Sequence, residues 1–562
     1  MNISVKDWFK SGSPWVWMNA GAVAISIIMV VGLLGLIAVR GLSHFWPADI
    51  LQGTYTQNGE TRTITGEVVE TSDVLTLQLI EAGIDLPEDN EFSTRHLLKI
   101  GNRDVYGSDF TWVLEDFLSD QSRPEMLFTA ERREWGNLYG YLRSIKESGN
   151  EVARYEGYEP SSEYLALWDN LQARIQRALD IHEDILQIEK HEIGAINYEL
   201  ERLRLKERSL QLKNITETAP FAKIEQRRKE LDDEYEDLQQ RLLDLYAEIN
   251  RDSMTAEVAN GKIVEVQLAK VVRAFRPNAM GIGQKSLHYA AKLWEFVSED
   301  PREANTEGGI FPAIFGTVMM VLLMSLLVTP FGVIAAVYLR EYAKQGFITR
   351  LIRIAVNNLA GVPSIVYGVF GLGFFVYFLG GNIDDLFFPE AKPAPTFGTP
   401  GLMWASLTLA LLTVPVVIVA TEEGLSRIPR SVREGSLALG ATKFETLMKV
   451  VLPMASPAMM TGVILAIARA AGEVAPLMLV GVVKLAPSLP LDGNYPFIHL
   501  DQKFMHLGFH IYDVGFQSPN VEAARPLVYA TALLLVAVIA LLNMSAIAIR
   551  NHLREKYKAL EM

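Results

Sequence analysis

The sequence lacks cysteine altogether, although it runs to 562 residues. This absence excludes disulfide bonds, thiolate metal ligands and cysteine nucleophiles anywhere in the chain. The polar block of residues 41–307 therefore has to be stabilised by ordinary core packing, even where it is exported.

Two motifs that would indicate nucleotide hydrolysis or metal binding by this chain itself are missing as well. No G-x-x-x-x-G-K-[ST] run occurs, and the nearest segment, Gly281–Ser286 (GIGQKS), lacks the Gly-Lys step that holds a nucleotide phosphate. His-Glu pairs begin at His182 and His191, but neither extends to the zinc-binding H-E-x-x-H. The sequence therefore predicts no enzyme, no metal site and no cofactor bound by this chain.

Asp, Glu, Lys and Arg are absent from six stretches, each long enough to cross a bilayer, which takes about 20 apolar residues. These stretches are Ser11–Val39, Gly308–Leu339, Ile354–Ile383, Pro393–Thr421, Val450–Ala468 and Pro526–Ile549. The fifth is the shortest, and we expect it to continue past Arg469 and Glu473 into Val474–Val483. The predicted fold class is an all-α membrane bundle of six transmembrane helices, with a mixed α/β insertion.

The first stretch resembles a secretory signal in following Lys6 and Lys10. Its apolar run is about twice as long as that of a signal peptide, and Arg40 follows it without an Ala-x-Ala site. We therefore expect a retained span, with cleavage as the alternative.

Loop charges predict the orientation. Fifteen Lys and Arg residues, from Lys6 to Lys558, lie in segments on the side of the N-terminus, and four lie in the short loops opposite (Lys392, Lys484, Lys503 and Arg525). Both termini are therefore expected in the cytoplasm with the 41–307 block outside, in a multi-pass membrane protein. In a bacterial cell, this would be the inner membrane and the block would lie in the periplasm.

The periplasmic block mixes strands with a long helical part. Thr54–Val69 alternates around Asn58-Gly59, which predicts a β-hairpin, and Leu97–Val105 predicts a further strand with a turn at Gly101-Asn102. Gly261–Phe275 resumes the alternation, and we expect it to pair with these early strands.

Between those strands, residues of about 163–252 predict a coiled-coil helical hairpin broken near Thr216–Phe221. Its second half has apolar residues at spacings of three, four and seven: Ile224, Leu231, Tyr235, Leu238, Leu242, Leu245 and Ile249. A charged hairpin with one apolar seam suits a spacer, and the alternative is a docking platform for an exported protein.

A cytoplasmic loop of residues 422–453 predicts two short helices. Ser431 with Glu434 and Thr442 with Glu445 both fit a capping box, and Gly440 suits the left-handed residue that ends the first helix. Such a loop either lies on the membrane surface or couples the spans to a cytosolic motor.

The same loop resembles the EAA loop of ABC importer permeases. The match consists of Glu434-Gly435-Ser436-x-x-x-Gly440, nine further residues, and Val450-x-Leu452-Pro453, although Gly435-Ser436 replaces the usual two alanines. The resemblance implies that this loop inserts into a separate ATPase subunit. The residues expected at that coupling surface are Arg433, Glu434, Gly435, Ser436, Gly440, Leu452 and Pro453.

Two further segments, Asn358–Leu372 and Thr461–Leu479, are similar to the PstA-type permeases of phosphate importers. The resemblance covers about 310–550 and the first span, whereas the 41–307 block departs from it. It implies an ABC importer permease fold and phosphate import powered by ATP at the partner ATPase. The expected partners are a second permease of the PstC type, a dimeric PstB-type ATPase, a PstS-type binding protein and membrane lipid, but no nucleic acid.

Arg469 and Glu473 stand out physically, because ionisable groups in a span are costly and usually face the bundle interior or a water-filled path. We expect Arg469 to bind phosphate oxygens and Glu473 to hold it in place, although a purely structural ion pair is the alternative. Asn357 and Asn358, at the start of the third stretch, either line the same path or cap a helix.

The expected organisation is a cytoplasmic tail and first span at 1–40, the insertion at 41–307, the permease core at 308–550 and a cytoplasmic tail at 551–562. Two other functions stay open: a permease for molybdate or sulfate, and a membrane-anchored coiled-coil scaffold or sensor. A scaffold needs neither the coupling loop nor charged residues within a span.

Overall fold

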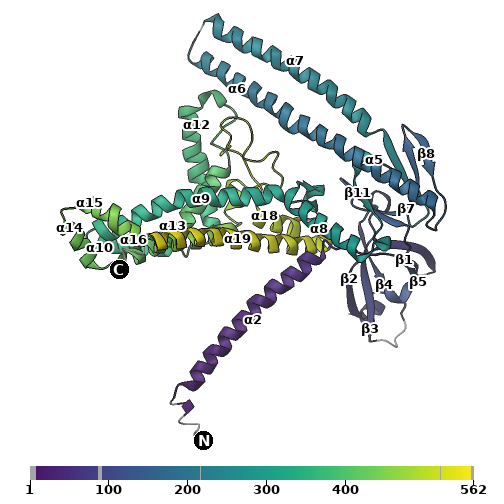
Figure 1. Cartoon of the computed structure of the whole chain (residues 1–562), viewed down its shortest axis with the longest axis horizontal. Coiled ribbons are helices and arrows are strands. Elements are labelled where there is room, and N and C mark those ends of the chain that lie inside the picture. The colour runs from purple at the N-terminus through teal and green to yellow at the C-terminus, as the bar shows by residue number, and fades with distance from the viewer. Residues whose placement is uncertain are drawn as a thin grey trace.

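A computed structural model describes residues 8–9, 11–57, 59–86, 91–215, 217–518 and 521–557. Lys6, Lys10, Lys558, Asn58 and Thr216, which the sequence predictions used, lie outside these residues. The chain has a part made of long apolar helices and an inserted domain, defined here as residues 44–310 between the helices α2 and α9 (Figure 1).

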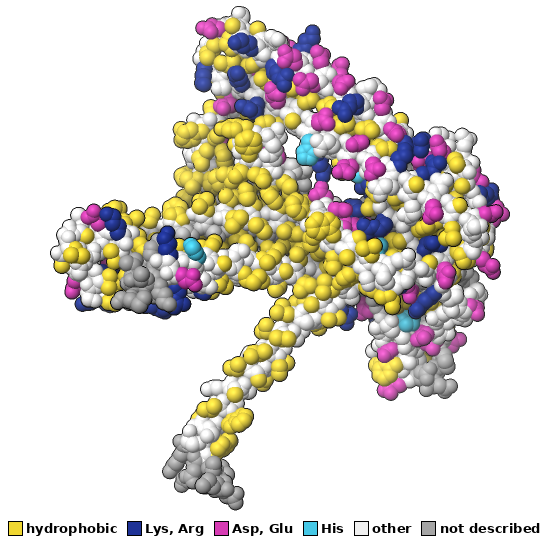
Figure 2. All heavy atoms as spheres, in the orientation of Figure 1, with side chains coloured by type: hydrophobic (Ala, Val, Ile, Leu, Met, Phe, Trp, Pro, Cys, Tyr) yellow, Lys and Arg dark blue, Asp and Glu magenta, His cyan; other side chains and the backbone are white. Residues whose placement is uncertain are grey.

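In the described part of the chain, six helical segments are long and apolar enough to cross a membrane. They are Ser13–Ser43 (α2), Phe311–Tyr342 (α9 with a π-turn), Ser364–Phe387 (α11 to α12), Leu402–Ser426 (α13), Lys443–Gly472 (α15 to α16) and Ala524–Lys556 (within α19, Val521–Tyr557). Helix α13 is the most enclosed and packs on α9 and α16, while α2 touches the rest mainly through α19. Apolar side chains cover these helices, whereas charged ones gather on the inserted domain (Figure 2).

The third apolar stretch, Ile354–Ile383, is divided between two helices. Helix α10 (Phe347–Leu359) ends before Gly361 and Pro363, and α11 (Ser364–Phe370) begins a new axis that continues through a π-helix, Gly371–Gly380, into α12 (Gly381–Phe387). Pro363 disfavours helical backbone at the residue before it, which favours a break at this point.

The inserted domain contains two main antiparallel sheets. The first has the order β4-β3-β2-β1-β5 and the second β10-β9-β7-β6-β11, with β8 on β7. The strands of the first sheet are β1 (Ile50–Gln57), β2 (Glu60–Leu75), β3 (Phe92–Lys99), β4 (Phe110–Leu114) and β5 (Leu118–Ser122). Those of the second are β6 (Leu127–Arg132), β7 (Leu138–Glu147), β8 (Asn150–Arg154), β9 (Asp252–Glu257), β10 (Ile263–Gln267) and β11 (Val271–Phe275).

The predicted hairpin between β1 and β2 is confirmed, with Gln57 paired to Glu60. Two other strand predictions hold only in part, one in its extent and one in its pairing. The strand expected at Leu97–Val105 ends at Lys99, because Gly101 and Asn102 adopt left-handed backbone and start the short helix α4 (Arg103–Tyr106). Gly261–Phe275 pairs with β9 and β6 rather than with the early strands.

A helical hairpin extends from the second sheet. It comprises α5 (Ser162–Leu186), a π-turn, α6 (Ile193–Leu212) and α7 (Thr218–Ile249), and five of the seam residues predicted on α7 are buried (Ile224, Leu231, Leu238, Leu242 and Ile249). Helix α6 reaches the loops between the apolar helices, where the Tyr198 hydroxyl donates to the carbonyl of Tyr495. The hairpin therefore lies beside those loops instead of projecting freely (Figure 1).

Helix α8 (Ile282–Ser298) and the short strands β12 (Pro301–Arg302) and β13 (Glu307–Gly308) lead from the second sheet into α9. The remaining short helices are α3 (Thr76–Glu81), α14 (Arg430–Ala438), α17 (Leu477–Val480) and α18 (Leu507–Tyr512).

Candidate functional site

Arg469 lies in the last turn of α16, a helix that packs against α13 and α19. Its side chain is 33% exposed, and its Nε lies 3.7 Å from Oε1 of Glu473. Within the described residues no other ion pair or hydrogen bond engages this guanidinium, so its two terminal nitrogens keep their donors. The helix dipole also favours a cation at this end of α16.

Helix α16 ends at Gly472, three residues after Arg469, which corrects the expectation of a span continuing to Val483. Glu473 has extended backbone (φ −79°, ψ 133°), and Pro476 has no N–H to continue the helix. Arg469 and Glu473 therefore do not share one helix face. The carboxylate instead belongs to the residue at which the backbone turns away, beside carbonyls that no longer accept helical hydrogen bonds.

The neighbouring helix α11 packs closely on this break. A Cβ added to Gly368 would lie 2.7 Å from the Cα of Pro476, so the approach requires glycine. Next to it, Tyr367 is buried, donates its hydroxyl to the carbonyl of Leu359 at 2.6 Å, and lies within range of the Arg469 charge. Sequence reasoning missed Tyr367 and Gly368, because their partner segment is remote in the chain.

Asn357 and Asn358 lie in the last turn of α10, before the break, and both are exposed. No side-chain hydrogen bond links either of them to Arg469 or Glu473 in the part of the chain that the structure describes. The structure thus brings Arg469 and Glu473 together but not the asparagines, whose role stays a prediction.

The loop of residues 422–453 forms the two predicted short helices, α14 and then α15 (Lys443–Thr446), which runs through a π-turn into α16. The Thr442 capping box is confirmed, with Oγ1 accepting from the amide of Glu445 at 3.2 Å. Gly440 is left-handed as expected (φ 89°). The Ser431 capping box is wrong, because α14 already starts at Arg430 after Pro429.

Arg433 points inward from α14. Its Nη2 donates to Oε1 of Glu341 at 2.9 Å and to the carbonyl of Leu425 at 2.8 Å, and its Nη1 donates to the carbonyl of Ile428 at 2.7 Å. Lys443 adds a bond to the Glu341 carbonyl at 2.6 Å. Arg433 therefore fastens the loop to the ends of α9 and α13, and both terminal nitrogens of its guanidinium are already occupied.

The outer face of α14 and α15 is exposed instead. Glu434 and Gly435 are exposed, Ser436 binds the Thr446 hydroxyl at 2.9 Å, and the apolar side chains of Leu439 and Phe444 are 91% and 63% exposed. Leu452 and Pro453 are half-buried at the start of α16 and support the loop from below. Of the predicted coupling residues, Glu434, Gly435 and Gly440 are thus the exposed ones, open to a partner.

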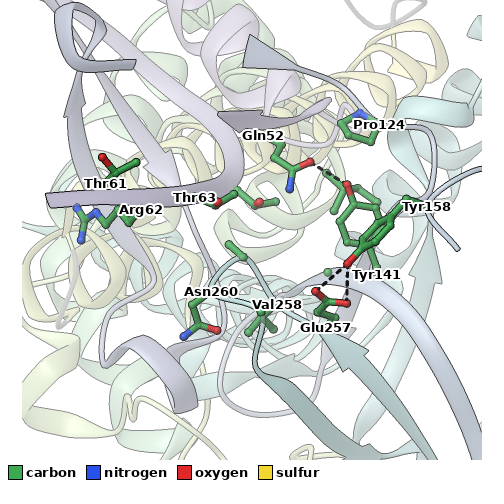
Figure 3. Close-up of a pocket in the computed structure, with 15 residues that line it drawn as sticks. Gln52, Thr61, Arg62, Thr63, Pro124, Tyr141, Tyr158, Glu257, Val258 and Asn260 are labelled. Carbon is green, nitrogen blue, oxygen red and sulfur yellow. Dashed lines mark hydrogen bonds between the residues drawn. The ribbon is translucent and has the colours of Figure 1, made fainter. Parts of the chain in front are cut away.

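A cleft of about 820 Å³ lies between the two sheets of the inserted domain (Figure 3). Thr61, Thr63 and Thr65 line the cleft. The carboxylate of Glu257, also in the lining, accepts a hydrogen bond from the Tyr158 hydroxyl and forms an ion pair with Arg143 at 2.6 Å. The cleft therefore offers hydroxyls, a carboxylate that is already paired, and the exposed guanidinium of Arg62, whose Cζ lies 5.5 Å from the centre of the Tyr55 ring. Among the residues described, no group of three His, Asp or Glu side chains could hold a metal ion.

Residues 328–559 match the family described as "Binding-protein-dependent transport system inner membrane component". The chain is 35% identical over 247 residues to "Phosphate transport system permease protein PstA 1" of Mycobacterium tuberculosis (strain CDC 1551 / Oshkosh), covering 43% of this chain and 71% of that protein. It is 31% identical over 221 residues to "Probable phosphate transport system permease protein PstA" of Methanocaldococcus jannaschii, covering 39% and 67%.

Among solved structures, the chain is similar to one described as "Inward facing conformations of the MetNI methionine ABC transporter: CY5 native crystal form". The identity is 20%, the TM-score is 0.32, and the alignment covers 43% of this chain and 94% of the other. The family match begins at residue 328, after the inserted domain.

Proposed function

The chain belongs to the family of binding-protein-dependent transport system inner membrane components, and within it to the PstA type of ABC importer permease, and on this premise we propose that it carries inorganic phosphate across the membrane. The import is driven by ATP, which a separate subunit hydrolyses. This chain supplies part of the path and the surface on which the motor acts.

The open guanidinium of Arg469 is the observation that carries the proposal. Ionisable side chains within spans are costly, by ~2.5–3.5 kcal/mol at the helix centre, and they usually face a hydrated path or the bundle interior. Arg469 lies in the last turn of α16, where this cost is lower, and its side chain is partly exposed. Its planar fork matches two oxygens of one oxyanion, and only one contact, to Glu473, uses it.

Glu473 favours phosphate over the alternative oxyanions. Phosphate keeps at least one O–H at neutral pH, which can donate to a carboxylate, whereas sulfate and molybdate have none. Beside Glu473, these fully deprotonated anions meet a like charge without a compensating hydrogen bond. The pair thus suits an anion that both accepts from Arg469 and donates to Glu473.

The family membership supports the assembly that we propose. A second, homologous permease of the PstC type encloses the path together with this chain, and a PstS-type binding protein delivers phosphate. A dimeric PstB-type ATPase docks on the exposed face of α14 and α15, led by Glu434, Gly435 and Leu439. Its closure on ATP moves this loop, which Arg433 fastens to α9 and α13, and so switches the path between its two openings.

The protein is a multi-pass membrane protein of the inner-membrane component family. In the orientation that we propose, both termini and the coupling loop are cytoplasmic, and the insertion of residues 41–307 is periplasmic. The predicted domain limits, with the core at 308–550 and tails at 1–40 and 551–562, belong to the same proposal.

The deciding experiment reconstitutes the complete complex in liposomes and measures ATP-dependent accumulation of radiolabelled phosphate, sulfate and molybdate in parallel. Accumulation of phosphate alone is expected. Accumulation of molybdate or sulfate instead would assign another oxyanion, and accumulation of none by an intact complex with ATPase activity would favour the scaffold.

A further inference from the structure

Helix α8 exposes an apolar face and turns its charged face towards the protein, the reverse of a helix that faces water. Its exposed stripe consists of Gly283, Leu287, Ala290, Ala291 and Trp294, at spacings of three, four and seven, and contains no charge. Leu287 and Trp294 are 74% and 71% exposed. Water-facing helices of soluble domains usually carry charged side chains on such a face.

The charged residues of α8 all point into the protein. Lys285 pairs with Asp49, and Lys292 pairs with Glu131 at 2.8 Å and with Glu295 at 3.2 Å. The side chain of Glu295 is only 3% exposed. The helix therefore uses its polar face to bind the inserted domain and leaves its apolar face free.

The ends of two candidate spans fix where this helix lies. Phe296 stacks near Phe45, just after α2, with ring centroids 4.9 Å apart, and its carbonyl accepts from the amide of Ile310, just before α9, at 2.8 Å. The ring of Trp46 lies beside that of Tyr289 in α8, with centroids 5.9 Å apart. Helix α8 thus joins the molecule where α2 and α9 leave the apolar layer (Figure 1).

We propose that α8 binds the lipid surface, with its apolar stripe at the boundary between headgroups and acyl chains. Amphipathic helices with Trp and Leu on one face lie in this zone, and Trp is enriched at both membrane interfaces. The continuity of α8 with the ends of α2 and α9 supports lipid as the occupant. The contact would anchor the inserted domain against the bilayer independently of the spans.

The lack of cysteine allows a direct test in the complete complex, reconstituted in phosphatidylcholine liposomes. Leu287→Cys and, separately, Ala290→Cys are spin-labelled, and their collisions with oxygen and with a water-soluble nickel chelate are measured. Leu243→Cys on α7 is the matched control, since Leu243 is 57% exposed on the charged hairpin. The proposal predicts that oxygen relaxes the labels on α8 more strongly than nickel, and that the control label shows the reverse.

Two results would overturn the proposal. Nickel accessibility at both α8 positions equal to that of the control would assign the stripe to water. Exclusion of both reagents would assign it to a protein neighbour, such as the second permease. Ala290 is small, so its substitution keeps the test available if the loss of Leu287 disturbs folding.

Discussion

Replacing Arg433 by alanine tests whether this residue fastens the coupling loop or contacts the ATPase. The substitution removes donors from Glu341, Leu425 and Ile428, and leaves the Glu341 carboxylate, whose side chain is only 14% exposed, without its Arg433 partner. Removing one partner of a buried pair costs ~3–5 kcal/mol. Because the Arg433 side chain is 20% exposed, solvent screening reduces our expectation to about 2–3 kcal/mol of local stability.

Amide hydrogen exchange of α14 in the purified complex measures this loss directly. A decrease of that size accelerates exchange through local opening roughly 30- to 150-fold, at ~1.4 kcal/mol per factor of ten. Arg430→Ala is the matched control, because Arg430 starts the same helix and is exposed, and we expect a change within ~0.5 kcal/mol.

The reasoning fails if Arg433→Ala leaves exchange in α14 unchanged but weakens binding of the ATPase subunit. In that event the guanidinium acts at the partner surface, as the family resemblance first implied.

Three further outcomes are expected. Gly368→Ala should lower phosphate uptake and thermal stability, since the new Cβ meets the backbone of Pro476, whereas Gly373→Ala, with open space around its Cβ, should not; equal effects would show that the contact is unimportant. Arg469→Ala should abolish uptake while insertion persists, and Arg469→Lys should restore it only in part, because ammonium lacks the fork; normal uptake by the alanine variant would make Arg469 structural. Burial lowers the pKa of His288 to about 4, and although burial alone would raise the pKa of Glu131, Lys292 and Arg273 bring it to about 2. The unfolded chain therefore binds more protons, and the inserted domain should lose stability as the pH falls from about 6.5 towards 4 and below, less steeply in His288→Gln; pH-independent thermal unfolding would contradict this.

The long helices were predictable because a bilayer demands continuous apolar sequence. Their breaks were not, since proline alone does not decide them. Pro330, Pro415 and Pro457 lie inside continuous helices, whereas the chain breaks beside Pro363 and Pro476. The difference lies in packing, such as the approach of α11 to the segment after α16, which is a tertiary property.

Predictions from local sequence motifs were limited in the same way, because tertiary structure decides their outcome. The sequences around Ser431 and Thr442 fit one capping pattern, but only Thr442 caps a helix, because Pro429 starts α14 earlier. Glu341, the partner of Arg433, belongs to another helix, so the sequence around Arg433 does not indicate this contact. Similarly, the alternation in β11 predicted a strand but not its pairing with β6.

The inserted domain begins and ends at nearly the same point, since Phe45 and Ile310 both contact Phe296. A domain whose two ends lie close together can be inserted between two helices without changing the distance between them. The outer segment is therefore a natural unit for transplantation, and a short bridge could replace it in this permease.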